Sequence, residues 1–353
     1  MNVIKSHPLK YYHMKHFGIF LSFMAAILLL TSCDSAGSFM NASGANNEVM
    51  VLMEDSAWEG EAGRALFNAL NSNAKALPQP EPNFRILQIL PENFTRSIKM
   101  ARNVLIPDIS TIYSNPRITS EIDKYAVGQV IMTIQAPDTA TFVQFVNENE
   151  ESIVDYFITK ELERNGLWLK GQISDPLSRA QQVFGINIHF PKGLTNVIEH
   201  PNFYWATNNA AHSRQDIVIY QIPYTSETVF EKDSLIALRN EVLGRYIKGS
   251  FDSQMTTAKI YPPDYRRIEV NGIFRGELRG LWEMTSDMMG GPFVMHAFVN
   301  ENTGMVVIVE TMVYAPEKNK RNLMRNLEAT LYTISMPQPE GVEIVSLIEL
   351  KFV

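Results

Sequence analysis

Apolar and polar residues alternate with a period of two in the C-terminal third of the chain. In the segment 273–282, one face carries Phe274, Leu278 and Trp282, and the other carries Arg275, Glu277 and Arg279. Such alternation is typical of a half-buried β-strand. The apolar runs 293–299 and 305–313 flank a polar turn at 300–304 and predict a hairpin. We therefore expect an antiparallel meander in this region.

Apolar residues recur with the period of an α-helix in three other segments. The first segment follows Asp138, and its apolar stripe consists of Phe142, Phe145, Val146, Ile153, Phe157 and Leu162. The second follows Ser226, and its stripe consists of Val229, Leu235, Leu238, Val242, Tyr246 and Ile247. The third extends from 317 to about 334. Each stripe predicts a helix with one face packed on a sheet.

Several apolar runs that favour strands stop at or just before a proline. They are 84–90 before Pro91, 129–135 before Pro137, 186–190 before Pro191, 217–222 before Pro223, and 305–314 before Pro316. Proline cannot donate to a sheet and fits the first turn of a helix, so each proline both ends a strand and admits a helix. The pattern predicts an α+β fold, with two packed subdomains of mainly antiparallel sheet covered by long amphipathic helices.

Two of these units align over a short stretch. Residues 90–98 and 190–198 share proline, threonine and isoleucine at matching positions. The alignment favours an internal duplication, but any unit of strand, proline and helix has a similar pattern. We expect a first α+β subdomain at 48–170, a second at 171–336, and a C-terminal tail at 337–353.

The N-terminal region has the features of an export signal. Lys5, Lys10 and Lys15 precede an uncharged apolar run at 17–30, which is too short to cross a bilayer comfortably. The run ends in Leu30-Thr31-Ser32-Cys33, which resembles the lipobox of bacterial lipoproteins. The resemblance implies that residues 1–32 are a signal peptide and that Cys33 becomes lipidated. Translation from Met14 in place of Met1 would also give a complete signal.

Residues 34–38 and 41–47 are small and polar, and this composition predicts a flexible tether over 33–47. Cleavage before Cys33 removes three lysines and no acidic residue, which changes the formal net charge from −7 to −10. An acidic body argues against nucleic acid as a partner. Because Cys33 is the sole cysteine, the chain has neither an internal disulfide nor a cysteine nucleophile once that thiol is lipidated.

No sequence motif identifies a catalytic site, a metal site or a cofactor. The four histidines after Cys33 are His189, His200, His212 and His296, and their spacing matches no metal-binding pattern. The chain has neither a phosphate-binding glycine loop nor the Gly-x-Ser-x-Gly motif of hydrolases. A hydrolytic site assembled from separated Glu, Asp, Ser or His residues remains an alternative.

Two groups of residues are candidates for ligand binding. Tyr204 and Trp205 lie in a predicted strand, where their rings point to opposite faces, so one of them can be exposed to stack on a sugar or a partner. Filling of the core is the competing interpretation. Arg275 and Arg279 lie on the polar face of the predicted strand at 273–282 and can bind a carboxylate or phosphate. Their competing interpretation is a solvated ladder of charges.

The chain as a whole resembles an uncharacterised lipoprotein family of Bacteroidetes, a domain of unknown function. The likeness covers the lipobox and most of the body, including Ile131-Met132-Thr133-Ile134-Gln135-Ala136-Pro137-Asp138-Thr139 and Gly272-Ile273-Phe274-Arg275-Gly276. It implies a lipid-anchored envelope protein at the outer membrane, and it implies no site residues. Our leading hypothesis is a non-enzymatic binding or assembly module with an envelope protein or glycan as partner. The alternatives are an envelope hydrolase and a structural protein of the envelope.

Lipidation of Cys33 is directly testable by metabolic labelling. Cells grown with labelled palmitate should incorporate the label into the wild-type protein, and the Cys33→Ala change should abolish incorporation because no other thiol is present. Equal labelling of the two proteins would contradict the predicted lipobox.

Overall fold

The computed structural model describes residues 40–172 and 177–337. The predicted signal peptide, Cys33 and nearly all of the predicted C-terminal tail lie outside this range. The chain from Ala42 onward forms one compact unit. Within the described ranges, no helix combines the length and the apolar character needed to span a membrane.

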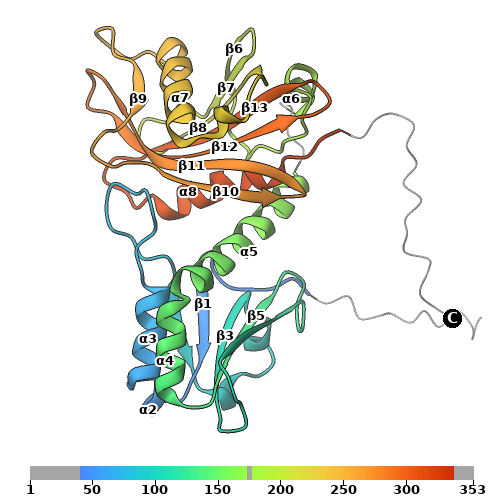
Figure 1. Cartoon of the computed structure of the whole chain (residues 1–353), viewed down its shortest axis with the longest axis vertical. Helices are drawn as coiled ribbons and strands as arrows, with labels where there is room; N and C mark the ends of the chain where they lie inside the picture. The colour runs from blue at the N-terminus through green and yellow to red at the C-terminus, as the bar shows by residue number, and fades with distance from the viewer. Residues whose placement is uncertain (1–39, 173–176, 338–353) are drawn as a thin grey trace, which may run out of the picture. The chain divides into compact units, whose positions relative to one another are not determined.

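The N-terminal part of the unit is built on a five-stranded sheet (Figure 1). Its strands are β1 (Glu48–Leu52), β2 (Arg85–Ile89), β3 (Asn103–Ile109), β4 (Arg117–Ile122) and β5 (Val130–Ala136), in the order β2-β1-β3-β5-β4. Three of the four pairings are parallel, and β4 pairs with β5 in the antiparallel sense. Parallel neighbours need crossover connections, and short helices supply the one between β1 and β2.

Helices cover one face of this sheet and enclose its core. They are α2 (Asp55–Trp58), α3 (Glu61–Leu70), α4 (Thr139–Glu148) and α5 (Glu150–Lys170), and two 3-10 turns, η1 (Pro91–Asn93) and η2 (Ile98–Met100), precede β3. The Asp138 side chain caps α4 by accepting from the Thr141 backbone N–H at 2.8 Å. Asn149 separates α4 from α5, so the single predicted helix after Asp138 is two consecutive helices.

The C-terminal part of the unit is built on an eight-stranded sheet in which every pairing is antiparallel. The strands are β6 (Asn196–His200), β7 (Phe203–Thr207), β8 (Arg214–Pro223), β9 (Met255–Thr257), β10 (Asp264–Val270), β11 (Ile273–Met284), β12 (Gly290–Asn300) and β13 (Met305–Tyr314). Their order is β10-β11-β12-β13-β8-β7-β6, and β9 pairs with β11. The predicted meander and the hairpin at 300–304 are therefore confirmed.

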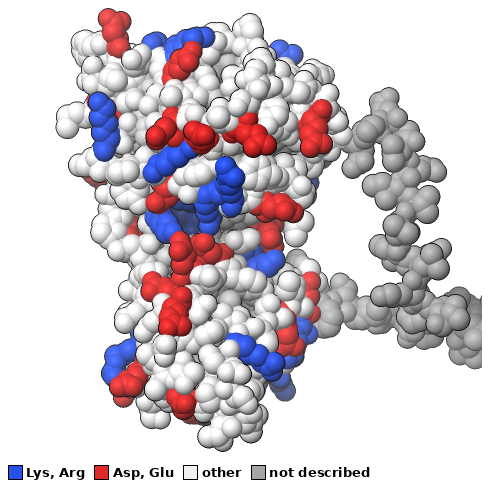
Figure 2. Space-filling model, viewed as in Figure 1, with Lys and Arg blue, Asp and Glu red and all other residues white. Residues whose placement is uncertain are grey.

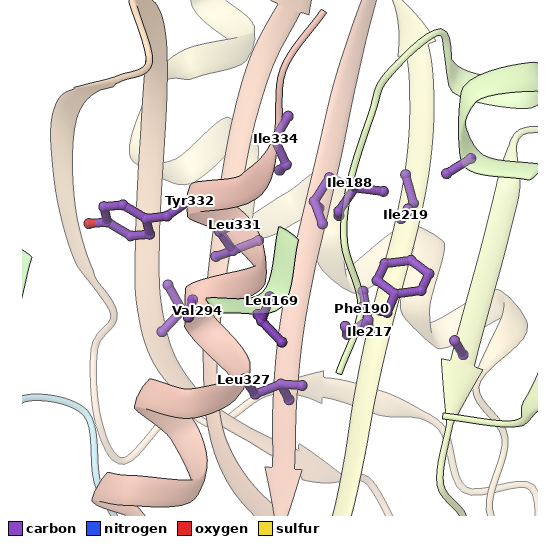
Figure 3. Close-up of a cluster of buried hydrophobic side chains, with 14 of the residues drawn as sticks. Leu169, Ile188, Phe190, Ile217, Ile219, Val294, Leu327, Leu331, Tyr332 and Ile334 are labelled. Carbon is purple, nitrogen blue, oxygen red and sulfur yellow. The ribbon is translucent and has the colours of Figure 1, made fainter. Parts of the chain in front are cut away.

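Both faces of the larger sheet are covered. The 3-10 turn η3 (Glu227–Phe230) and helix α7 (Lys232–Tyr246) enclose one core, which includes Leu235 and Leu243. On the other face lie α6 (Leu177–Phe184), α8 (Arg321–Glu328) and the 3-10 turn η4 (Ala329–Thr333). Figure 3 shows this second cluster, to which Leu327 on α8, Leu331 on η4, and Ile217 and Ile219 on β8 all belong. The helix predicted at 317–334 thus begins at Arg321 and ends as a 3-10 turn.

Helix α5 contributes to the cores of both sheets. Ile153 and Phe157, in the first half of α5, are buried in the core of the smaller sheet. Leu162 and Leu169 are buried in the core between the larger sheet and α8. Its C-terminal half also packs on η4. The predicted subdomain boundary at 170 therefore follows the end of a helix whose last turns belong to the second core.

The α+β class is confirmed, and antiparallel pairings predominate across the two sheets taken together. The internal duplication is not supported by the topology, because one sheet is mostly parallel and the other entirely antiparallel. The strand predicted at 186–190 is wrong. Alternate residues of this segment are buried in the core on the α8 side of the larger sheet, but the segment forms no ladder, and Asn187 makes only an isolated bridge to Ser335.

The end of the predicted tether packs on the body. The Ala42 backbone N–H donates to the Val127 carbonyl, and the Ser43 N–H donates to the Met100 carbonyl, both at 2.8 Å. Asn47 is buried. Short polar residues favour a tether only while their backbone groups have no partner, and here the turn η2 before β3 and the loop after β4 supply the partners.

A fully buried ion pair joins α7 to the larger sheet. The Arg239 Nε and Nη2 groups donate to both oxygens of Glu310 on β13, at 2.7 to 3.1 Å, and Nη1 donates to Thr257 Oγ1 at 2.9 Å. Neither charged side chain has any exposed surface. Burial raises the pKa of Glu310, and the Arg239 charge opposes that rise. Arg239 therefore favours the charged form of Glu310 inside the protein.

Removal of Arg239 should be strongly destabilising. We expect Arg239→Met to lower the free energy of unfolding by about 3–5 kcal/mol, because it leaves the Glu310 carboxylate buried without a partner. Arg245→Met is the matched control on the same helix. Its ion pair with Glu241 is more than half exposed on both sides, so its loss should cost less than about 1 kcal/mol. Urea unfolding monitored by circular dichroism measures both, and equal losses would contradict the account.

Candidate functional site

A cavity of about 610 Å³ is lined by residues from the helices and loops around the smaller sheet and by residues from the larger sheet and α8. The loop after α3 contributes 72–77, α4 and α5 contribute residues between 147 and 158, and β10 contributes 264–266. Strands β11 and β12, helix α8, and Asn83 in the loop before β2 provide the remaining lining residues. Segments far apart in the sequence therefore meet at one cavity.

The cavity has an apolar surface and a charged surface. Val154, Ile158, Phe293, Val294 and Met324 supply apolar side chains, and most of these are buried. Figure 2 shows acidic and basic side chains gathered beside one another on the face in view. A volume of this size and a mixed lining are typical of small-molecule binding sites.

Glu277 on β11 lies at the centre of a charged network beside the cavity. Its Oε1 accepts from Arg266 Nε at 2.6 Å, and its Oε2 lies 3.2 Å from His296 Nε2. Arg266 also donates to Asp155 Oδ2 at 2.8 Å, which links β10 to α5. Arg279 lies 3.6 Å from Glu277 and is held by both oxygens of Glu328 on α8, at 2.5 and 3.1 Å.

The network holds Glu277 in its charged form. Burial alone would raise the pKa of Glu277, but Arg279, His296 and Arg266 together hold it well below its usual range. Burial lowers the pKa of His296, against the opposing effect of Glu277. Glu277 is thus a permanent carboxylate whose oxygens are already occupied. Such a group serves binding and structure better than proton transfer.

Arg325 on α8 lines the same cavity and has a different environment. It is 5% exposed. Its Nη1 donates to Asn47 Oδ1 and to the Asn83 carbonyl, both at 2.7 Å, and its Nη2 donates to Asn83 Oδ1 at 2.6 Å. No carboxylate among residues 40–172 and 177–337 forms an ion pair with it. Burial lowers the pKa of Arg325 to about 9, and the nearby Glu328 offsets this only in part.

The four predicted ligand-binding residues do not converge. Arg279 lines the cavity, whereas Arg275, Tyr204 and Trp205 are not among the residues that line it. Arg275 is fully buried, and its guanidinium donates to the carbonyls of Val270, Leu331 and Ile334, so it anchors η4 to the sheet. The charged row on β11 is therefore not a solvated ladder, because η4 and α8 cover it.

Tyr204 and Trp205 are held in the body of the protein, because β7 lies between β6 and β8 and both of its faces are covered. Tyr204 is buried and stacks on Phe190 with 6.1 Å between ring centroids. The Trp205 Nε1–H donates to Asp216 Oδ1 at 3.0 Å. Both rings serve the interior, in agreement with the core-filling interpretation.

Sequence reasoning did not select Arg325. Helical spacing placed it on the helix predicted at 317–334, but an arginine on an amphipathic helix is usually solvated. What makes Arg325 unusual is its burial against Asn47 and Asn83, which are more than 240 residues distant. A contact over that separation leaves no local signal in one sequence.

Comparisons with known proteins give two domain matches. Residues 42–167 match a domain of unknown function (DUF8532), and residues 174–333 match a second domain of unknown function (DUF4837). No curated protein matches the chain. The solved structure of the Ran-binding protein Mog1p of Saccharomyces cerevisiae is similar over 43% of this chain and 90% of that chain, with 9% sequence identity and a TM-score of 0.29. The chain thus consists largely of two domains of unknown function.

Proposed function

We propose that this chain is a lipid-anchored protein of the bacterial cell envelope, and that its body is a non-enzymatic binding module with the cavity as its ligand site. The lipobox at Leu30–Cys33 supports the anchor, and the resemblance to envelope lipoproteins supports a position at the outer membrane. The cavity of about 610 Å³ supports binding and is the observation that carries the proposal.

The charged groups at the cavity support binding over catalysis. A hydrolase needs a carboxyl group or an imidazole that exchanges protons near neutral pH. Glu277 and Glu328 are both buried in the charged network. They form the kind of carboxylate pair that a hydrolase would need. Both carboxylates are bound to Arg279, and Glu277 also accepts from Arg266. Neither is available to deliver a proton or to attack a substrate.

Photocrosslinking in the intact envelope tests this function. A photoreactive benzoylphenylalanine replaces Leu77, a partly buried residue that lines the cavity. The matched control places it at Phe251, which is 91% exposed and is not among the lining residues. We expect irradiation to yield a defined protein or glycan adduct at position 77 that is absent at position 251.

The pattern of adducts decides the outcome. No adduct at position 77, or bulk phospholipid at both positions, would contradict a ligand site in the cavity. Purification of the adduct followed by mass spectrometry distinguishes these results.

A further inference from the structure

The hydrogen bonds of Arg325 leave one edge of its guanidinium without a protein partner. Both Nη1 hydrogens and one Nη2 hydrogen are donated to Asn47 and Asn83. No described residue accepts from Nε or from the second Nη2 hydrogen. These two groups form the side edge of the guanidinium, which matches the two oxygens of a carboxylate.

The orientation of Arg325 is fixed before any ligand arrives. Asn83 accepts from the end of the guanidinium through both its carbonyl and its side chain, and its own Nδ2 donates to Ser72 Oγ at 3.2 Å. The Nδ2 of Asn47 donates to Asn322 Oδ1 at 2.9 Å. A ligand that meets Arg325 therefore meets a rigid donor pair, so little conformational freedom is lost on binding.

Burial makes the side edge a strong anion site. A charge that is removed from water without a counter-ion is unfavourable, and a carboxylate that pairs with it is bound in surroundings where water competes poorly. Glu328 lies one turn along α8, but its two oxygens are engaged by Arg279. A ligand in the cavity can then supply the counter-ion.

The remainder of the lining favours a ligand that also carries a positive charge. The lining contains five Lys or Arg residues and six Asp or Glu residues, so its formal net charge is −1. Glu148, Glu150 and Asp264 line the cavity, and none of them forms an ion pair with a described residue. A multiply charged anion would be repelled by these groups, whereas an ammonium group would be attracted.

We propose that the cavity binds a zwitterionic ligand of the peptide class. Its carboxylate pairs with Nε and Nη2 of Arg325, its ammonium group lies toward Glu148, Glu150 and Asp264, and its apolar part packs on Ile158, Val294 and Met324. This inference rests on the proposed binding function and names the chemistry of the ligand.

The experiment compares four probes by isothermal titration calorimetry on the full-length lipidated chain in detergent. The probes are trialanine, N-acetyl-trialanine, trialanine amide and inorganic phosphate. We expect trialanine to bind best and the amide at least about ten-fold more weakly, because the amide has no carboxylate for Arg325. N-acetylation should also weaken binding, and phosphate should bind more weakly than trialanine.

Variants assign the effect to Arg325. Arg325→Lys keeps the charge but loses the side edge, and we expect it to weaken trialanine binding at least about ten-fold. Arg245→Lys is the matched control, because Arg245 lies on α7 outside the cavity lining and pairs with Glu241 at the surface. It should change the affinity by less than about two-fold. If Arg325→Lys does not fold, the four probes on the wild-type chain still decide the question.

Several results would overturn the inference. These are equal binding of trialanine and its amide, unchanged affinity in a folded Arg325→Lys chain, phosphate binding as tight as trialanine, or no binding of any probe. Each leaves the proposed function standing if position 77 still yields a defined adduct in the envelope. Loss of that adduct contradicts the proposed function independently of these probes.

Discussion

A charge that is removed from water needs either an opposite charge or hydrogen-bond partners in place of the lost water, and this constraint organises the larger sheet and its helices. Arg239 and Glu310 meet it as a pair and fix α7 to one face. Arg279 meets it with Glu277 and Glu328 and fixes α8 to the other face. These ion pairs replace apolar packing at positions where a helix crosses the sheet, and they require that both partners be placed accurately.

The same constraint explains how the cavity is assembled. Helix α5 is buried in the cores of both sheets, so Asp155 on α5 is brought to Arg266 on β10. The lining combines residues that already satisfy one another with Arg325, whose partners are neutral. A ligand that supplies the missing negative charge would complete the arrangement. Binding and stability are therefore coupled through one guanidinium.

The sequence predicted the local structure well and the surroundings of each charge poorly. Alternation identified β11 and placed Arg275, Glu277 and Arg279 on one face, because period two is a property of the backbone. It did not reveal that η4 and α8 cover that face, because the contact spans about 50 residues. For the same reason, 186–190 was predicted as a strand although no neighbouring strand completes a ladder there.

The most direct measurement of the central claim is the free energy of unfolding of Asn83→Asp and Asn83→Ala chains in urea at neutral pH. Asn83 already accepts from both Nη groups of Arg325, so an aspartate at this position places a carboxylate against the buried charge. The account predicts that Asp raises the free energy of unfolding above wild type, whereas Ala lowers it. If the Asp chain is destabilised as much as the Ala chain, an added carboxylate does not stabilise the Arg325 charge. That result would contradict the account.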